Sequence, residues 1–177
     1  MRILGVDPGT RRTGVGVIEA SGSRYKLVHH GVIQTGETLP IAQKLHAIFH
    51  ELSKIIREYK VDVLALENIF YAKNIRSMVK IGEARACAML AASEHEIDVI
   101  EYLPTTVKQA VSGHGLASKE QVQAMVKTLL QLKVVPPVDE ADALAIAICH
   151  LHHHQDYQWK NTKKTSTRVL TAQSIGR

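Results

Sequence analysis

Hydrophobic residues in the first part of the chain come in short runs separated by glycine and polar residues, a pattern typical of β-strands. The runs lie at residues 3–6, around residues 14–18 and around residues 25–33. Ser21-Gly22-Ser23 separates the last two runs as a turn. The pattern therefore predicts three consecutive strands that form an antiparallel meander.

Between residues 40 and 60 the spacing of apolar residues changes to steps of three and four, which predicts one face of an amphipathic helix. The apolar positions of this face are Ile41, Leu45, Ile48, Leu52, Ile55 and Tyr59. A strand that ends at Leu66, a helix over about 74–94 and a strand over 97–102 follow. Because strands and helices alternate here, a mixed α/β sheet is expected.

Helical signals dominate the rest of the chain. A short helix starts at Pro104 and is broken by Ser112-Gly113-His114-Gly115. Ser118, with Gln121 three residues later, makes a capping box for a helix that runs to about Leu130. A final helix is expected from about Asp139 to His153, after Pro136-Pro137. Residues 155–177 are polar, basic and aperiodic, so a flexible C-terminal tail is expected.

Composition places the chain among soluble globular proteins. Its 177 residues, 45% hydrophobic and 22% charged, suit one domain rather than two and exclude a disordered chain. We expect a cytoplasmic protein, since neither a leader nor an apolar run of about 20 residues is found. Cys87 and Cys149 are expected to be buried thiols. The net charge of +5 favours a polyanionic partner without proving one.

Acidic side chains stand where apolar elements end or begin. Asp7 follows the first apolar run and Glu67 follows the run 61–66, so both are predicted at C-terminal ends of strands. Asp139 and Asp142 open the final helix, and their i, i+3 spacing places them on one face, about 5–6 Å apart. The carboxyl ends of neighbouring strands are where α/β sheets bind ligands. All four carboxylates would meet if the final helix packs across that edge.

Each acid has a plainer interpretation when taken alone: Asp139 as a helix cap, Asp7 as a turn residue and Glu67 as a solvated strand end. Together they would repel one another unless cations neutralise them. An all-oxygen site favours Mg²⁺ or Mn²⁺ over zinc. Two such ions, about 3.5–4 Å apart, activate a water and stabilise the leaving oxygen of a phosphodiester. We therefore expect nucleic-acid strand hydrolysis, with Asp7 bridging both ions.

Several motifs in order give the chain a specific family resemblance. They are Ile3-Leu4-Gly5-Val6-Asp7-Pro8-Gly9, Leu66-Glu67-Asn68-Ile69-Phe70, Lys73-Asn74 with Gly82-Glu83-Ala84-Arg85, Pro104-Thr105-Thr106-Val107-Lys108-Gln109-Ala110-Val111, Ala117-Ser118-Lys119-Glu120-Gln121-Val122-Gln123 and Asp139-Glu140-Ala141-Asp142-Ala143-Leu144-Ala145. Over roughly residues 1–154 the chain resembles the RuvC Holliday-junction resolvases of the ribonuclease H-like superfamily. The resemblance implies an α/β nuclease domain over 1–154: a mixed five-stranded sheet, an antiparallel meander then parallel strands, flanked by helices.

The resemblance also implies an activity. The family's catalytic, metal-binding carboxylates fall on Asp7, Glu67, Asp139 and Asp142, the set already selected from position. A homodimeric endonuclease with two Mg²⁺ ions per site is implied, which nicks two strands of like polarity in a four-way DNA junction. The nicks would carry 5′-phosphate and 3′-hydroxyl ends that a ligase can seal. The resemblance further implies work beside a RuvA–RuvB branch-migration complex in homologous recombination and DNA repair.

DNA contacts are expected around the acidic site. Phe70 and Tyr71 form an aromatic pair, and aromatic faces stack on exposed bases. The resemblance assigns Phe70 to the unpaired centre of the junction, although it could instead fill the core. Lys108 and Lys119 match basic family positions near the scissile strand. The other basic residues considered for DNA binding, which could equally form a solvated helix face, are Lys73, Arg76, Lys80 and Arg85.

Two further segments invite interpretation. The helix over 74–94 has a broad apolar face with small residues, which explains core packing and, in the resembled family, part of the dimer interface. His150 and His154 have an i, i+4 spacing that could bind zinc or nickel. The simpler interpretation is a helix C-terminus that favours partly charged imidazoles.

Two other classes of protein are weighed against the nuclease. Asp7-Pro8-Gly9 before a glycine-containing hairpin also resembles the first phosphate motif of actin-like ATPases and sugar kinases. Those folds need a second domain and a second phosphate loop, and no GxxxxGK[ST] element occurs in this sequence. A non-catalytic junction-binding module would lack one or more acids, yet all four are present. Hydrolysis therefore remains the favoured interpretation.

Overall fold

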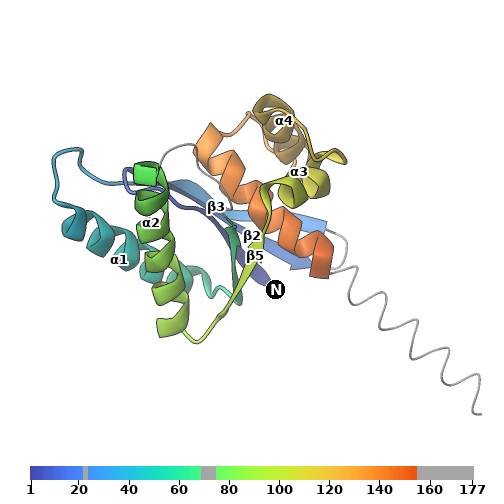
Figure 1. Cartoon of the computed structure of the whole chain (residues 1–177). Coiled ribbons are helices and arrows are strands. Elements are labelled where there is room, and N and C mark those ends of the chain that lie inside the picture. The colour runs from blue at the N-terminus through green and yellow to red at the C-terminus, as the bar shows by residue number, and fades with distance from the viewer. Residues whose placement is uncertain (22–23, 69–74, 155–177) are drawn as a thin grey trace, which may run out of the picture.

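A mixed five-stranded sheet forms the centre of the structure (Figure 1). The strands β1 (Arg2–Asp7), β2 (Arg12–Ser21) and β3 (Arg24–Gln34) pair antiparallel. The strands β4 (Val63–Glu67) and β5 (Asp98–Tyr102) extend the other side of β1 in parallel. The resulting order, β3-β2-β1-β4-β5, confirms the predicted meander followed by parallel strands.

Helices cover both faces of the sheet (Figure 1). On one face lie α1 (Ile41–Tyr59) and α2 (Ile75–Glu94), which pack against each other. On the other lie α3 (Pro104–Ser112), α4 (Lys119–Leu129) and a final helix over residues 138–154. Because the final helix is sandwiched between the sheet and α3–α4, every residue over 143–151 is buried.

Alternation along the strands divides the core into two halves. In β1, Ile3 faces the final helix, whereas Leu4 and Val6 face α1 and α2. In β4, Val63 and Ala65 face the final helix and the leucines beside them face the other way. Successive side chains of a strand point to opposite faces. Asp7 is in step with Ile3, two positions beyond Gly5, and Glu67 is in step with Ala65, so both acids lie on the face covered by the final helix.

The computed structural model describes residues 1–21, 24–68 and 75–154. The predicted tail over 155–177 and the centre of the predicted turn at 22–23 lie outside these ranges. Within them, Ser118 and Gln121 form the predicted capping box, and both cysteines are buried as expected. None of the described helices combines the length and the apolar character needed to cross a membrane.

Candidate active site

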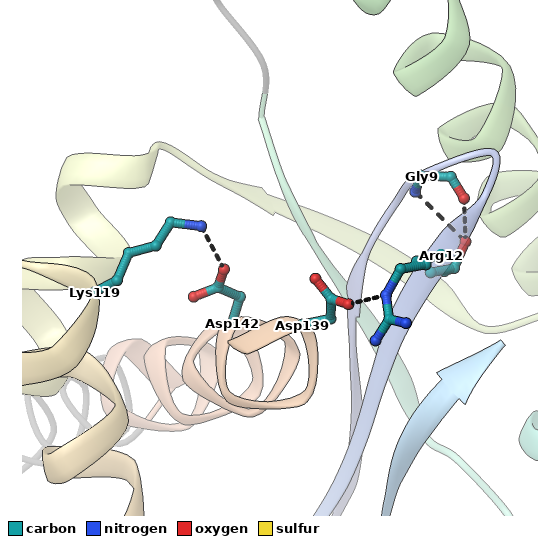
Figure 2. A network of polar contacts seen from close by, with 6 residues as sticks. Gly9, Arg12, Lys119, Asp139 and Asp142 are labelled. Carbon is teal, nitrogen blue, oxygen red and sulfur yellow. Dashed lines mark hydrogen bonds and ion pairs between the residues drawn. The ribbon is translucent and has the colours of Figure 1, made fainter. Parts of the chain in front are cut away.

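Asp7 and Glu67 end adjacent parallel strands. The pairing of Val6 with Leu66 in the last recorded register between β1 and β4 places the two acids at neighbouring strand ends. Both side chains point to the face of the final helix, as the alternation requires. The turn after Asp7 is held by Thr13, whose hydroxyl donates to the Gly9 carbonyl oxygen over 2.7 Å (Figure 2). Asp7 therefore sits at a rigid position at the centre of the sheet edge.

Strand glycines bring the final helix against the backbone of the sheet. A Cβ atom at Gly5 would lie 2.0 Å from the carbonyl oxygen of Ala143, and one at Gly14 would lie 2.0 Å from that of Asp139. Gly14 is also the β2 partner of Asp7 in the antiparallel register. Only a residue without a Cβ leaves room for this approach. The glycines thus place the first turn of the final helix directly over Asp7.

The charges of neighbouring acids alter the ionisation of Asp7 and Glu67. Burial, followed by the charges of Asp142, Glu67 and Asp139, raises the pKa of Asp7 to about 7. Burial and the charge of Asp142 also raise the pKa of Glu67. Clustered carboxylates without a counter-ion resist losing their protons. The acids of the final helix are therefore near enough to the strand ends for their charges to act on Asp7 and Glu67, and the assignment of all four to one metal site stays a prediction.

Two basic side chains hold the acids of the final helix (Figure 2). The guanidinium Nε of Arg12 donates to Asp139 Oδ2 at 2.5 Å, and the Lys119 ammonium donates to Asp142 Oδ2 at 3.3 Å. In the described part of the chain, no three Asp, Glu, His or Cys side chains are grouped tightly enough to hold an ion. In the structure as it stands, two of the four carboxylates are instead engaged by cations of the protein itself.

Arg12 was missed by the sequence analysis. Arg12 starts β2 and belongs to no recognisable sequence motif. Its ion pair with Asp139 of the final helix becomes visible only in the folded structure. Lys119, in contrast, lies at the site as the resemblance implied. The charge of Asp142 is the main cause that raises the pKa of Lys119, which stays a cation. Lys108 on α3 is near enough for its charge to act on Glu67.

The remaining expected DNA contacts have varied placements. Phe70, Tyr71 and Lys73 lie outside the described residues, as does the side chain of Arg76 on α2. Lys80 is exposed on α2 and lines a pocket near the start of α1. Arg85 instead forms an ion pair with Glu101 of β5, and both side chains are largely buried. Arg85 therefore ties α2 to the sheet.

The histidines at the end of the final helix differ from the expectation of partly charged imidazoles. His150 is buried, and its Nδ1 is 2.9 Å from the hydroxyl of Tyr102 on β5. Burial, with smaller effects from His154 and His153, lowers the pKa of His150 to about 4. His150 is therefore neutral near pH 7 and packs in the protein interior. The prediction of a partly charged imidazole was wrong for this residue.

The raised pKa of Asp7 predicts how stability depends on pH when metal is removed. The ordinary pKa of 3.8 applies to the unfolded chain, so between about pH 4 and 7 the folded protein keeps a proton that the unfolded chain has lost. The free energy of unfolding contributed by this proton therefore falls as pH rises. Between pH 5 and pH 8 we expect the contribution of Asp7 to lower the free energy of unfolding by roughly 2–3 kcal/mol.

Urea unfolding with a chelator at both pH values measures this effect as the difference between the wild type and Asp7→Asn. The difference is needed because the buried His150 acts in the opposite direction, gaining stability as pH rises. Asp98→Asn, at the far end of β5, is the control and should match the wild type. Equal pH dependence in the wild type and Asp7→Asn would show that Asp7 does not hold the proton.

Comparisons with known proteins agree with this geometry. The profile of the family described as "Crossover junction endodeoxyribonuclease RuvC" matches residues 3–150. The RuvC protein of Pelotomaculum thermopropionicum is 48% identical over 165 residues, which cover 93% of this chain and 99% of that relative. The structure of Thermus thermophilus RuvC in complex with Holliday junction substrate superposes with a TM-score of 0.83 at 33% identity, covering 87% of this chain and 94% of that one.

A more distant likeness concerns the fold alone. The yeast mitochondrial Holliday junction resolvase matches with a TM-score of 0.67 at 14% identity and covers 92% of this chain and 83% of that one. The shared architecture, a mixed five-stranded sheet flanked by helices, defines a ribonuclease H-like protein. Within that class the chain belongs to the RuvC family of crossover junction endodeoxyribonucleases.

Proposed function

We propose that this protein resolves Holliday junctions, as an endonuclease that uses Asp7, Glu67, Asp139 and Asp142 as its catalytic carboxylates. The observation that carries this proposal is the convergence of the four acids on one site within a RuvC-family fold. Neither competing class explains it. A junction-binding module has no need for mutually repelling, half-buried acids, and the phosphate-binding folds need a second domain.

The donor chemistry of the site fits divalent metal ions. Its acids supply only oxygen ligands, and their mutual repulsion, seen in the raised pKa of Asp7, is relieved by a cation. We infer that the four carboxylates hold two Mg²⁺ ions, for which Mn²⁺ can substitute. Ions bound in this way supply activation of a water and stabilisation of the leaving oxygen. Asp7, between Glu67 and the acids of the final helix, is the residue suited to contact both ions.

The protein's own cations complete the proposed reaction. Water adds to phosphorus and the bond from phosphorus to O3′ breaks, so the phosphate remains on the 5′ end and the 3′ end gains a hydroxyl. Lys119, already paired with Asp142, can orient a phosphate oxygen of the scissile group. Lys108 reinforces the positive potential on the side of Glu67. Arg12 balances the negative charge of Asp139, a role that bound metal ions would take over.

A dimer follows from the symmetry of the substrate and from the surface of α2. Apolar residues remain exposed along this helix, and an exposed apolar patch typically marks an interaction site. They are Ile75, Met78, Val79 and Leu90. A two-fold homodimer that buries them would present two equivalent sites to two strands of like polarity. We infer that Phe70 engages the junction centre and that a RuvA–RuvB complex is the cellular partner, both from family membership.

One assay tests the proposed function directly. Purified protein is mixed with a labelled four-way junction or with a linear duplex of the same sequence, in Mg²⁺, in Ca²⁺ or in chelator. We expect paired nicks in the junction with Mg²⁺ only, and products that ligase reseals, because the nicks keep 5′-phosphate and 3′-hydroxyl ends. Equal cutting of the duplex, or cutting in chelator, would contradict the proposal.

A further inference from the structure

A basic pocket lies beside the turn that follows Asp7, on the side of α1 and α2. Its wall includes Thr10 and Arg11 of the turn, Lys44 of α1 and Lys80 of α2, with one acid, Glu37. These residues come from four separate segments of the chain. None of the four carboxylates, and no residue of the final helix, lines this pocket.

Buried hydrogen bonds fix this pocket relative to the active-site turn. The hydroxyl of Thr35 donates to the Thr10 carbonyl oxygen over 2.7 Å, and the Thr35 amide donates to the Arg11 carbonyl oxygen over 3.1 Å. Thr10 and Thr35 are both buried. Because the same short turn carries Asp7 at its start, the pocket and the acid are held by one rigid segment.

Charge in the pocket is positive and only partly compensated. Glu37 pairs with Arg11, so its carboxylate is already engaged. Lys44 is only 9% exposed and donates to the main-chain oxygen of Glu37 over 2.9 Å, which uses one of its three N–H donors. Among the described residues neither Lys44 nor Lys80 forms an ion pair. A buried ammonium without an acid partner is costly unless an anion approaches it.

The start of α1 adds to the same potential. Its first turn lies at the pocket, contains no acidic residue and presents the positive end of the helix dipole. Lys80, from α2, supplies a cation on the opposite wall. A hydroxyl, a guanidinium and ammonium groups around one cavity match the oxygens of a phosphate group.

We propose that this pocket binds a non-scissile phosphate of the DNA strand next to the cleavage site. The inference rests on the proposed function, because it takes the bound polyanion to be the junction that the carboxylates cut. A phosphate held here would fix the position of the strand relative to Asp7 through the shared turn. The pocket thus sets which phosphate of the strand lies at Asp7. Arg11, Lys44 and Lys80 are therefore positioning residues rather than catalytic ones.

Binding of a four-way junction, measured by fluorescence anisotropy in chelator over a range of salt concentrations, tests this proposal. The variant is Lys44→Met with Lys80→Gln, in which methionine keeps the buried stem of Lys44. We expect roughly tenfold weaker binding and a salt slope reduced by about one, the value for one lost phosphate contact. Lys80→Gln alone should show part of the loss in junction affinity. Because Lys80 is exposed, this single variant should remain folded even if the double variant does not.

Lys54→Gln with Arg57→Gln is the matched control, because it removes the same charge from the far end of α1. Its affinity and salt slope should stay near those of the wild type. Junctions with single neutral methylphosphonates near the cut locate the contact. At one position the neutral group should weaken binding by the wild type roughly tenfold. The same junction should bind the double variant as well as the unmodified junction does, because the effects of removing the phosphate charge and of removing its protein partner are not additive.

The outcomes separate this proposal from the proposed function. Unchanged affinity and slope in Lys80→Gln and in a folded double variant, with normal cutting by the wild type, would overturn the pocket alone. Equal losses in the variant and in the control would do the same, since they would reflect net charge. Failure of the wild type to bind or cut any junction would instead overturn the proposed function.

Discussion

Asp7→Asn is expected to abolish junction cutting, with a fall in rate of about 1,000-fold or more. The amide keeps the size of the side chain but removes the charge and an anionic oxygen from the centre of the acidic cluster. Asp7 lies between Glu67 and the two acids of the final helix, and all three raise its pKa. Its loss should therefore impair every ion at the site. Single-turnover cutting of a labelled junction measures the effect.

Junction binding supplies the internal control for this variant. Asp7→Asn removes a negative charge, so affinity for the junction should be equal to or slightly above that of the wild type. Asp98→Asn, an exposed acid at the opposite edge of the sheet, should cut normally. If Asp7→Asn kept its rate in the same Mg²⁺ concentration, the assignment of the metal-binding carboxylates would be wrong.

Gly5→Ala is expected to damage stability and activity together. The new methyl group would lie 2.0 Å from the Ala143 carbonyl oxygen and 2.8 Å from the Ala147 amide nitrogen, so the final helix must move outward. Overpacking of this kind costs about 1–3 kcal/mol, and contact with backbone rather than a mobile side chain favours the upper value. Displacement of Asp139 and Asp142 by about 1 Å should reduce cutting about 100-fold.

Urea unfolding and single-turnover cutting measure both effects. Gly31→Ala on β3 is the matched control, because its methyl group would meet only His29, at an ordinary distance of 3.7 Å. That variant should stay within about 0.5 kcal/mol of the wild type and cut at the normal rate. A Gly5→Ala protein as stable and active as the wild type would show that the helix has room to spare at β1.

The order and type of the elements could be read from the sequence because their patterns are local. The helix predicted over 40–60 is found at Ile41–Tyr59, and the one predicted from about 74 to 94 is found at Ile75–Glu94. Short apolar runs, three- and four-residue spacing and a capping box are each set by neighbours along the chain. Position at strand ends and at the start of the final helix likewise led to the choice of the four acids, whose role as metal ligands stays a prediction.

Contacts between distant segments were not readable in the same way. The partnership of Arg12 with Asp139 depends on the strand register and on how closely the final helix approaches. That approach is set by Gly5 and Gly14, which the sequence marks only as small residues within strands. The burial of His150 depends on Tyr102, a residue of another element. Each of these facts concerns packing, for which a single sequence has no periodic signal.

Closure of the site by the final helix has a consequence during protein synthesis. Asp139 and Asp142 are synthesised long after Asp7, and they reach it only when the final helix docks onto the glycines of the sheet. A nascent or truncated chain that ends before residue 138 holds only half of the carboxylates. Such fragments should be unable to nick DNA, so a growing chain should stay harmless to the chromosome until the final helix has been made and has docked.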